Sequence, residues 1–312
     1  MIITHRPIAP LSAYVDAIWF TSRDALPHSR ERGLPTGRVD IVIPLLQDSI
    51  VRFDGVDSSE ARHFRGAVVS GAHDRFVVRG MAGASSVIGV KFKPGGAAIF
   101  FGGALRLLGN RTILLDDVWG PAARDLRQRL QAALQPSQKI RILERELLSR
   151  LSGAPPNDRM VTWAVHALEL NPSAARITAI QRASDCSPQQ FIRRFAGTVG
   201  ITPKRYARVL RFNTLLLRLA RVGPRDWANV AAEAGYFDQS HLIHEFRQMA
   251  GITPASYQPL HIGQPTHVPV LSMAHGTRRR KNLQYPGRGG DYHGLDHPVE
   301  VRAHDNPTNR NP

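Results

Sequence analysis

The chain has 312 residues, enough for about two domains of ordinary size. Hydrophobic residues make up 42% of it, so each domain can bury a core, and the formal net charge is +16. A basic surplus of this size indicates nucleic acid as a partner, with an anionic membrane surface as the alternative. The single cysteine, Cys186, excludes an intramolecular disulfide and a cysteine-based zinc site.

Two further absences in the sequence bear on where the protein works. The first ten residues, MIITHRPIAP, lack the apolar segment behind a basic head that marks a secretory leader. No apolar run approaches the roughly eighteen residues that a membrane span needs. Together with the lone thiol, these features predict a cytoplasmic protein that does not enter a membrane.

The basic surplus is concentrated in the second half of the chain. Residues 171–260 carry 12 basic and 5 acidic side chains, whereas residues 1–170 carry 22 and 16. The partner suggested by the charge is therefore expected to contact the segment from 171 to 260.

The first half begins with β-structure and ends with helices. Short β-branched runs separated by Gly, Asp and Ser predict a small barrel or sandwich, and they lie at 39–45, 50–53, 67–71, 75–80 and 87–92. From Gly96 onward the apolar period changes. Amphipathic helices are predicted at 119–134 and 137–151, with Ser137 as the N-cap of the second.

Changes in composition and in apolar periodicity divide the chain into four parts. Residues 1–152 form the β-rich domain with its C-terminal helices, and residues 153–159 form a Pro/Gly-rich linker. Residues 160–260 are expected to be helical throughout. Residues 261–312 have no apolar period and predict a disordered basic tail, in which the basic run 277–281 adds non-specific attraction to DNA.

An internal repeat occupies the helical part. FAGTVGITPKRY (195–206) and FRQMAGITPASY (246–257) match at Phe, Gly, Ile, Thr, Pro and Tyr with a constant offset. Agreement at that many positions indicates one structural unit of about fifty residues used twice.

Each unit has the plan of a helix, a tight turn and a second helix. The first helix is predicted at 176–184 in one copy and 227–234 in the other, and the second at 188–195 and 239–246. Ser187 and Asp238 stand where a helix N-cap is needed, and Pro188 suits the first helical position. This is the helix-turn-helix plan, which places its second helix in the major groove of DNA.

The apolar residues of each second helix follow one stripe. Phe191 and Phe195 in the first copy, like Leu242 and Phe246 in the second, lie four residues apart and are expected to be buried. The polar side chains between them are then left to point outward.

Both copies resemble the DNA-binding domain of AraC/XylS-type bacterial transcription regulators. The match spans roughly residues 160–258 and includes AAEAGYFDQSHLIHEFRQMAGITP (231–254), with Gly-Ile-Thr-Pro-x-x-Tyr after each second helix. RPIAPLSAYVDAIWF (6–20), LPTGRVDIVI (34–43) and GVKFKPGGA (89–97) resemble one branch of the same regulators.

The resemblance implies an α+β architecture. A cupin-like N-terminal barrel or sandwich, serving as a sensor, would precede two helix-turn-helix units joined by one long helix, supplied here by residues 203–220. Two recognition helices held about 34 Å apart can read successive segments of the major groove from one side.

The first unit departs from the family at three positions. Asp185 stands where a glycine is usual, and it tolerates a left-handed backbone better than most residues. Gln181 and Ser184 replace residues that are usually apolar, so the first unit is expected to pack less well than the second.

Matching the family's positions assigns the residues that contact DNA. Base contacts are expected from one group on each recognition helix: Gln189, Ile192 and Arg193, then Gln239, Ser240 and His244. Arginine can bind guanine with two hydrogen bonds, and glutamine can bind adenine in the same way. The alternative is that these side chains are only solvated, or, for Ile192, part of the core. Arg194, Lys204 and Arg205, with Arg208 and Arg211, are expected to meet phosphates or solvent.

Other candidate sites have weaker support. His241 and His244 have metal-binding spacing but no evident third ligand, so no metal or cofactor is expected. Cys186 is expected to pack inward at the turn rather than sense redox state. Trp19, Phe20 and the strands up to Phe92 could line an effector pocket, or could form a core used only for dimerisation. No phosphate loop, nucleophile elbow or catalytic acid pair is evident.

The sequence therefore predicts a transcription factor that binds specific double-stranded DNA and is not an enzyme. RNA polymerase, a small-molecule effector and a second copy of the chain are its expected partners. The alternative is a DNA-targeted enzyme or repair protein whose N-terminal domain performs chemistry. A third possibility, an architectural DNA binder, explains less well why two recognition helices are rigidly spaced.

Overall fold

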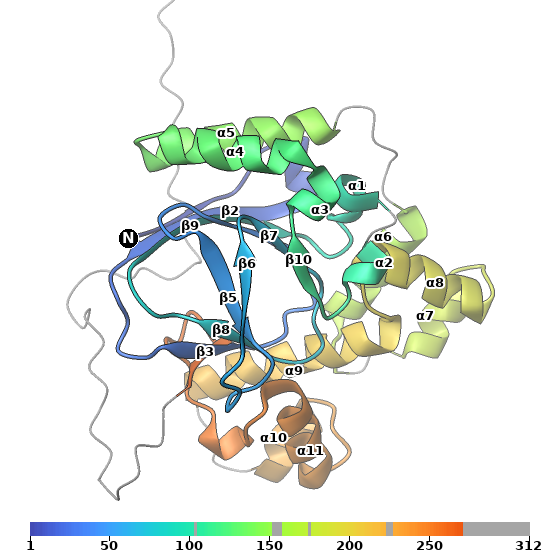
Figure 1. The fold of residues 1–312 in the computed structure, drawn as a ribbon. Helices are drawn as coiled ribbons and strands as arrows, with labels where there is room; N and C mark the ends of the chain where they lie inside the picture. The colour runs from blue at the N-terminus through green and yellow to red at the C-terminus, as the bar shows by residue number, and fades with distance from the viewer. Residues whose placement is uncertain (103–104, 152–157, 174–175, 223–226, 271–312) are drawn as a thin grey trace, which may run out of the picture.

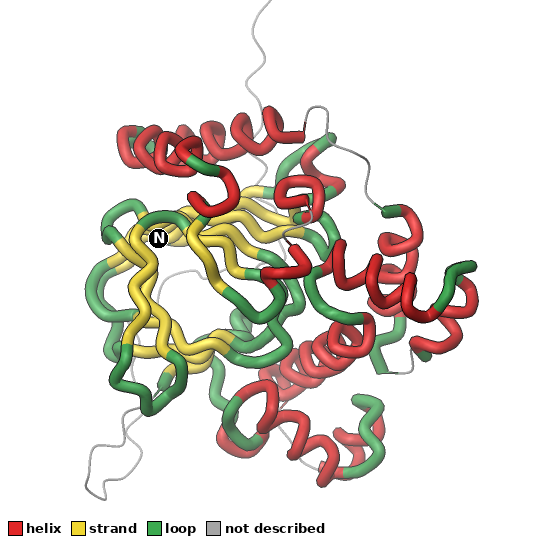
Figure 2. The backbone as a smooth tube through the Cα atoms, turned by 45° about the vertical axis from the view of Figure 1, so that its right-hand side comes forward, coloured by secondary structure: helices red, strands yellow, loops and turns green. Residues whose placement is uncertain are grey.

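A computed structural model describes residues 1–102, 105–151, 158–173, 176–222 and 227–270. The first half contains two antiparallel sheets that face one another, and helices surround them (Figures 1 and 2). The second half is helical. The α+β architecture that the sequence predicts is thus confirmed.

The first sheet has six strands in the order β1-β2-β9-β4-β7-β10. Their bounds are Ile2–His5 (β1), Val15–Arg23 (β2), Ser85–Phe92 (β9), Asp40–Pro44 (β4), Val68–Ser70 (β7) and Thr112–Leu114 (β10).

The second sheet has five strands in the order β11-β3-β8-β5-β6. Their bounds are His267–Pro269 (β11), Arg30–Gly33 (β3), Val77–Gly80 (β8), Ser49–Phe53 (β5) and Ala61–Arg65 (β6). The sequence patterns locate β4, β5, β7, β8 and β9. They miss β2, which precedes the first predicted run, β3 and β6, which are rich in charged residues, and the short strands β1, β10 and β11.

The first sheet buries one face under helices. Ile41 and Ile43 of β4 and Ile88 and Val90 of β9 belong to a hydrophobic core that continues into α4 (Pro121–Ala132) and α5 (Pro136–Leu151). Figure 1 shows α4 and α5 lying across this sheet. Because side chains alternate along a strand, the residues between these isoleucines and valines point the other way, into the space between the sheets.

The helices that follow the strands differ from the prediction at their starts. The expected helix 119–134 is divided at Gly120, whose φ of 62° ends α3 (Asp116–Trp119) before α4 begins. Ser137 is not an N-cap, because α5 already begins at Pro136. Two short helices, α1 (Ala98–Phe101) and α2 (Leu105–Leu108), precede β10.

The helical part has six α-helices in its described residues. They are α6 (Arg159–Leu170), α7 (Ile177–Ala183), α8 (Pro188–Val199), α9 (Pro203–Val222), α10 (Trp227–Glu233) and α11 (Gln239–Ala250). Asp158 caps α6 by accepting hydrogen bonds from the backbone N–H groups of Met160 and Val161. The remainder of the predicted linker lies outside the described residues.

The expectation of a structureless tail from residue 261 is wrong for its first ten residues. Strand β11 pairs with β3 in the second sheet, and Val268 is only 3% exposed. Tyr257 Oη donates to the Pro265 carbonyl at 2.7 Å, and Leu34 N donates to the Thr266 carbonyl at 2.8 Å. One buried valine in a three-residue strand leaves no periodic signal, which is why the sequence does not reveal it. The rest of the predicted tail, 271–312, lies outside the described residues.

Truncation at two points separates the strand from the tail. A chain ending at 270 should melt at the temperature of the full chain. A chain ending at 260 should lose about 2–4 kcal/mol of unfolding free energy, because it loses the Val268 side chain and the hydrogen bonds of β11. Thermal melts of both chains measure the difference, and equal melting temperatures for the two truncations would contradict the role assigned to β11.

Candidate nucleic-acid interface

The two repeated units adopt the same helix-turn-helix arrangement in the structure. In the first, α7 leads through a turn into α8; in the second, α10 leads into α11, and α9 connects the units (Figure 1). Ser187 Oγ accepts from Gln190 N at 3.3 Å while Gln190 Oε1 accepts from Ser187 N at 3.1 Å, which makes a capping box. Asp238 Oδ1 accepts from His241 N at 2.7 Å. Both predicted N-caps are confirmed.

The first turn is held together by the residues that depart from the family. Asp185 has a φ of 51°, in the left-handed region where glycine is usual. Gln181 Nε2 donates to the Cys186 carbonyl at 3.0 Å, and Ser184 Oγ donates to the Gln181 carbonyl at 2.6 Å. The polar residues at 181 and 184 therefore stabilise the turn by hydrogen bonds where apolar residues would pack.

The repeated Phe and Tyr form the same contact in both units. The ring centroids of Phe195 and Tyr206 are 5.7 Å apart, and those of Phe246 and Tyr257 are 5.8 Å apart. The three phenylalanine or tyrosine rings at 195, 206 and 246 are fully buried. The repeat recognised in the sequence is thus the core of each unit, where the end of the recognition helix meets the segment after Gly-Ile-Thr-Pro.

The residues predicted to read bases lie on the open side of both recognition helices. In α8, Phe191 and Phe195 face inward, and Gln189, Ile192 and Arg193 are exposed. Ile192 is 47% exposed, so it does not belong to the core.

On α11 the corresponding side chains are also open to solvent. Gln239, Ser240 and His244 are exposed, while Leu242 and Phe246 are buried. Each unit therefore presents its three predicted residues on one free helix face.

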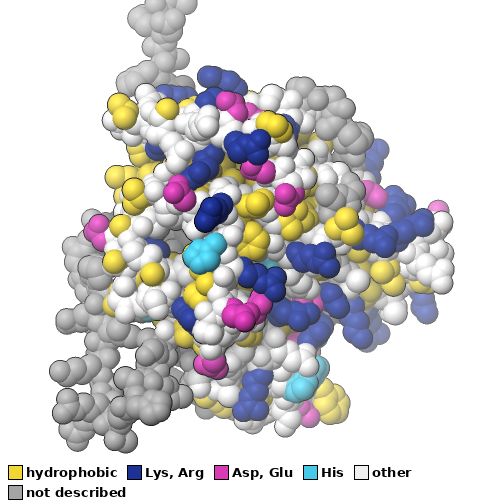
Figure 3. All heavy atoms as spheres, in the orientation of Figure 1, with side chains coloured by type: hydrophobic (Ala, Val, Ile, Leu, Met, Phe, Trp, Pro, Cys, Tyr) yellow, Lys and Arg dark blue, Asp and Glu magenta, His cyan; other side chains and the backbone are white. Residues whose placement is uncertain are grey.

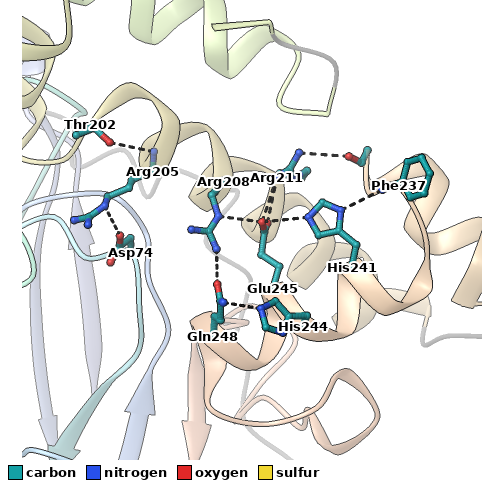
Figure 4. A network of polar contacts seen from close by, with 11 residues as sticks. Asp74, Thr202, Arg205, Arg208, Arg211, Phe237, His241, His244, Glu245 and Gln248 are labelled. Carbon is teal, nitrogen blue, oxygen red and sulfur yellow. Dashed lines mark hydrogen bonds and ion pairs between the residues drawn. The ribbon is translucent and has the colours of Figure 1, made fainter. Parts of the chain in front are cut away.

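A buried carboxylate orients the second recognition helix. Glu245 of α11 is 4% exposed and accepts from Arg208 Nε at 3.0 Å and from Arg211 at 3.4 Å, both on α9 (Figure 4). Arg208 also donates to Gln248 Oε1 at 2.8 Å, and Gln248 Nε2 lies 2.7 Å from His244 Nε2. A chain of polar contacts thus extends from α9 to a predicted base-reading residue. Sequence periodicity places Glu245 next to the apolar stripe but cannot show what it pairs with.

All four arginines predicted to meet phosphates or solvent have carboxylate partners within the chain, and for Arg208 and Arg211 the partner is the buried Glu245. Arg194 donates twice to Asp158, at 2.8 Å each, and ties α8 to the start of α6. Although burial opposes the shift, the hydrogen bond from Arg194 holds the pKa of Asp158 below its usual value. Arg205 Nε lies 3.2 Å from Asp74 Oδ2, between β7 and β8 (Figure 4). Lys204 is exposed.

The helical module also packs directly on the N-terminal half. α8 lies against α1 and α2, where a Cβ on Gly109 would come within 2.5 Å of the Gly200 carbonyl oxygen. Phe76 N donates to the Met249 carbonyl at 2.7 Å, and Asn213 Nδ2 donates to the Pro35 carbonyl at 3.2 Å. No local sequence pattern reveals these contacts, because each joins residues far apart in the chain.

Basic side chains gather on this part of the surface. Figure 3 shows Lys and Arg side chains over the region where Figure 1 places α8 and α9. Within the described residues, no three His, Cys, Asp or Glu side chains come together as metal ligands, and no helix is long and apolar enough to cross a membrane.

Comparisons with known proteins support this description of the helical part. Residues 180–259 match the family described as a helix-turn-helix domain, and residues 3–114 match a domain of unknown function (DUF6597). The chain is similar to the crystal structure of ToxT from Vibrio cholerae O395, with 8% identity, a TM-score of 0.42 and coverage of 77% of this chain and 96% of that chain.

A second solved structure gives a comparable match. It is wild-type ToxT from Vibrio cholerae strain SCE256 with an unsaturated fatty acid bound, with 11% identity, a TM-score of 0.42 and coverage of 77% of this chain and 94% of that chain. No curated protein sequence matches the chain.

Removal of a repeated ring tests the core of the second unit. Phe246→Ala should lower the unfolding free energy by about 3–5 kcal/mol, because a fully buried aromatic side chain is lost. Phe237→Ala, in the turn of the same unit, removes a ring that is 92% exposed and should change stability by less than about 0.5 kcal/mol. Urea unfolding of both variants measures the difference. Equal stabilities would show that the ring at 246 does not hold the unit together.

Proposed function

We propose that this chain, a DNA-binding transcription regulator with an AraC/XylS-type helix-turn-helix domain, reads a defined site with both recognition helices under the control of a small molecule sensed by its N-terminal domain. The observation that carries the proposal is the pair of free helix faces. Each of α8 and α11 buries its apolar stripe and exposes three predicted side chains, of which Gln189 and Arg193 correspond in the repeat to Ser240 and His244. RNA polymerase and a second copy of the chain are the proposed protein partners.

The length of α9 suits this function. A helix of 20 residues extends about 30 Å at 1.5 Å per residue. One turn of duplex DNA covers about 34 Å, so two units separated by such a helix match the spacing of successive major-groove segments on one face. α9 is also anchored to α11 through Glu245, which keeps the separation rigid.

The proposed base-reading set is Gln189, Ile192 and Arg193 on α8 and Gln239, Ser240 and His244 on α11. Arg193 suits a guanine, Gln189 and Gln239 suit adenines, and the exposed Ile192 suits a thymine methyl group. Arg194, Lys204 and Arg205 are proposed to hold phosphates. Arg194 and Arg205 would have to share or leave their carboxylate partners on binding, and Lys204 would not.

Replacement of Arg193 separates reading of bases from attraction to phosphates. A preferred site is first selected from a random duplex pool with the full chain. Arg193→Ala should then weaken binding to that site by about 1–3 kcal/mol and relax the preference at one base pair. Lys204→Ala is the matched control, since it removes one exposed positive charge just outside α8. It should weaken all duplexes about equally and lower the salt slope by roughly one.

The measurement is a matrix of both variants against duplexes with single base changes at several salt concentrations. Failure to select any site would overturn the proposed function itself. A uniform loss for Arg193→Ala, with altered base preference for Lys204→Ala, would reverse the two roles.

The ion pair between Asp74 and Arg205 connects the N-terminal half directly to the DNA-binding half. Asp74→Asn should release Arg205 for a phosphate, strengthen binding to all duplexes severalfold and raise the salt slope by roughly one. Added to an Arg205→Ala chain, the same change should have no effect, which provides the control. Filter-binding titrations measure the unaltered chain, the two single variants and the double variant, and equal affinity of Asp74→Asn and the unaltered chain would show that the pair does not restrain Arg205.

A further inference from the structure

The space between the two sheets is lined by charged side chains, in contrast to the apolar core under α4 and α5. Asp40 lies beside Ile41 of the core, and Lys91 lies between Val90 and Phe92 of the core, so both point away from the helices and into this space. The two residues are register partners on β4 and β9. The first sheet thus contributes one acidic and one basic side chain to the interior.

A second group comes from the facing sheet. Glu31 of β3, fully buried, accepts from Arg79 of β8 and lies 2.8 Å from His267 Nδ1 of β11. Burial would raise the pKa of Glu31, but Arg79 and His267 hold it well below its usual range, so Glu31 stays ionised. Glu31 is therefore the direct ion-pair partner of Arg79, and its charge reaches Arg52 only at longer range.

Arg52 of β5 is a third cation in this interior, beside Lys91 and Arg79, and it interacts with the charges of Glu31 and Asp40 only at longer range. Its Nε is buried and makes no hydrogen bond, and no carboxylate of the described residues forms an ion pair with it. Burial, with the neighbouring Arg79 as the second cause, lowers the pKa of the Arg52 guanidinium to about 9. A buried guanidinium that lacks a counterion is costly unless an anion joins it.

The interior also offers open polar atoms and accessible surface. Arg79 Nε and Asp40 Oδ1 are buried without hydrogen-bond partners. The side chains of His267 and Arg79 are 35% and 25% accessible to water, although the Glu31 that they contact is 1% accessible. These side chains therefore border space that water can enter.

An apolar wall completes the lining. Trp19 lies between Ile18 and Phe20 of the core and so faces the interior, where its indole covers Gly89. A Cβ at position 89 would lie within 2.5 Å of that ring, which explains the glycine. Val42 and Val68 also lie opposite core residues of their strands.

We propose that the space between the sheets binds a small organic carboxylate, with Arg52 as the residue that pairs with the carboxylate group. The proposal deepens the sensing part of the proposed function and rests on it. The guanidinium can donate two parallel hydrogen bonds to a carboxylate, and Arg79 Nε supplies a further donor. One unpaired cation suits one negative charge, and the Trp19 ring and the valines accept the hydrocarbon part of the ligand.

The test compares two acids with their uncharged amides. Succinate, benzoate, succinamide and benzamide are titrated into the full chain by calorimetry. At least one acid should bind, and at least tenfold more tightly than its amide. Arg52→Gln should weaken that binding at least tenfold. Arg62→Gln is the matched control, because Arg62 is the register partner of Arg52 on β6 but is 67% exposed and paired with Asp54. It should leave the affinity within twofold.

The Arg52→Lys variant distinguishes loss of the carboxylate contact from a general disturbance of folding. It keeps the charge and loses the paired donors, so it should bind the acid with an affinity between those of Arg52→Gln and the unaltered chain. Melting curves of all variants without ligand confirm that they fold.

Three outcomes would overturn the proposal: no binding of either acid, equal binding of acid and amide, or an equal loss in Arg52→Gln and Arg62→Gln. Titration of the same protein preparations with the selected DNA site keeps this failure separate from failure of the proposed function. DNA binding would persist if only the carboxylate proposal fails, and it would be absent if the proposed function fails.

Discussion

The rest of the structure depends on α8, which packs against both the N-terminal half and the other helices of the helical module while one of its faces stays exposed. Its stripe of Phe191, Phe195 and Val199 is buried, and the Gly200 carbonyl oxygen at its C-terminal end lies so close to Gly109, just after α2, that a Cβ at position 109 would collide with it. The hydrophobic core consequently runs without a break from the first sheet into the helical module. The first helix-turn-helix unit is thus built against the N-terminal half rather than suspended from a linker.

The second unit is held more indirectly. α9 joins it to the first unit, Glu245 fixes its recognition helix to α9, and the segment between β7 and β8 reaches both (Figure 4). In that segment Asp74 pairs with Arg205 and Phe76 bonds to Met249. The residue before them, His73, faces the interior of the sheets, where burial lowers its pKa to about 4 and Arg52 adds to the shift. Four consecutive residues therefore connect the charged interior with the start of α9 and the end of α11.

The helical half could be predicted from the sequence because its signals are local. A cap, a turn and an apolar stripe each occupy a few neighbouring residues, and the repeat supplies each signal twice. Ser187, Asp238 and the buried phenylalanines are accordingly where the sequence placed them. The exposed faces of α8 and α11 follow from the same periodicity.

The parts that could not be predicted depend on contacts across long stretches of chain. Arg194 and Arg205 look alike in the sequence as free cations, and only the fold brings Asp158 and Asp74 to them. The strands β3 and β11 are short and polar because they contribute Glu31 and His267 to the interior, so they lack the apolar alternation of β4 and β9. Strands whose inward-facing side chains are polar cannot be recognised from the hydrophobicity pattern of the sequence.

The same reasoning bears on why the interior is charged at all. Replacement of a whole buried group of ion pairs by apolar residues of similar volume is often neutral or stabilising, so stability alone does not require a charged interior. The facing wall already supplies Trp19 and valines that could pack against such a residue. Arg52 contributes a positive charge that burial disfavours and that Glu31 and Asp40 offset only at longer range. That charge acts on His73, and an anion between the sheets would stabilise it.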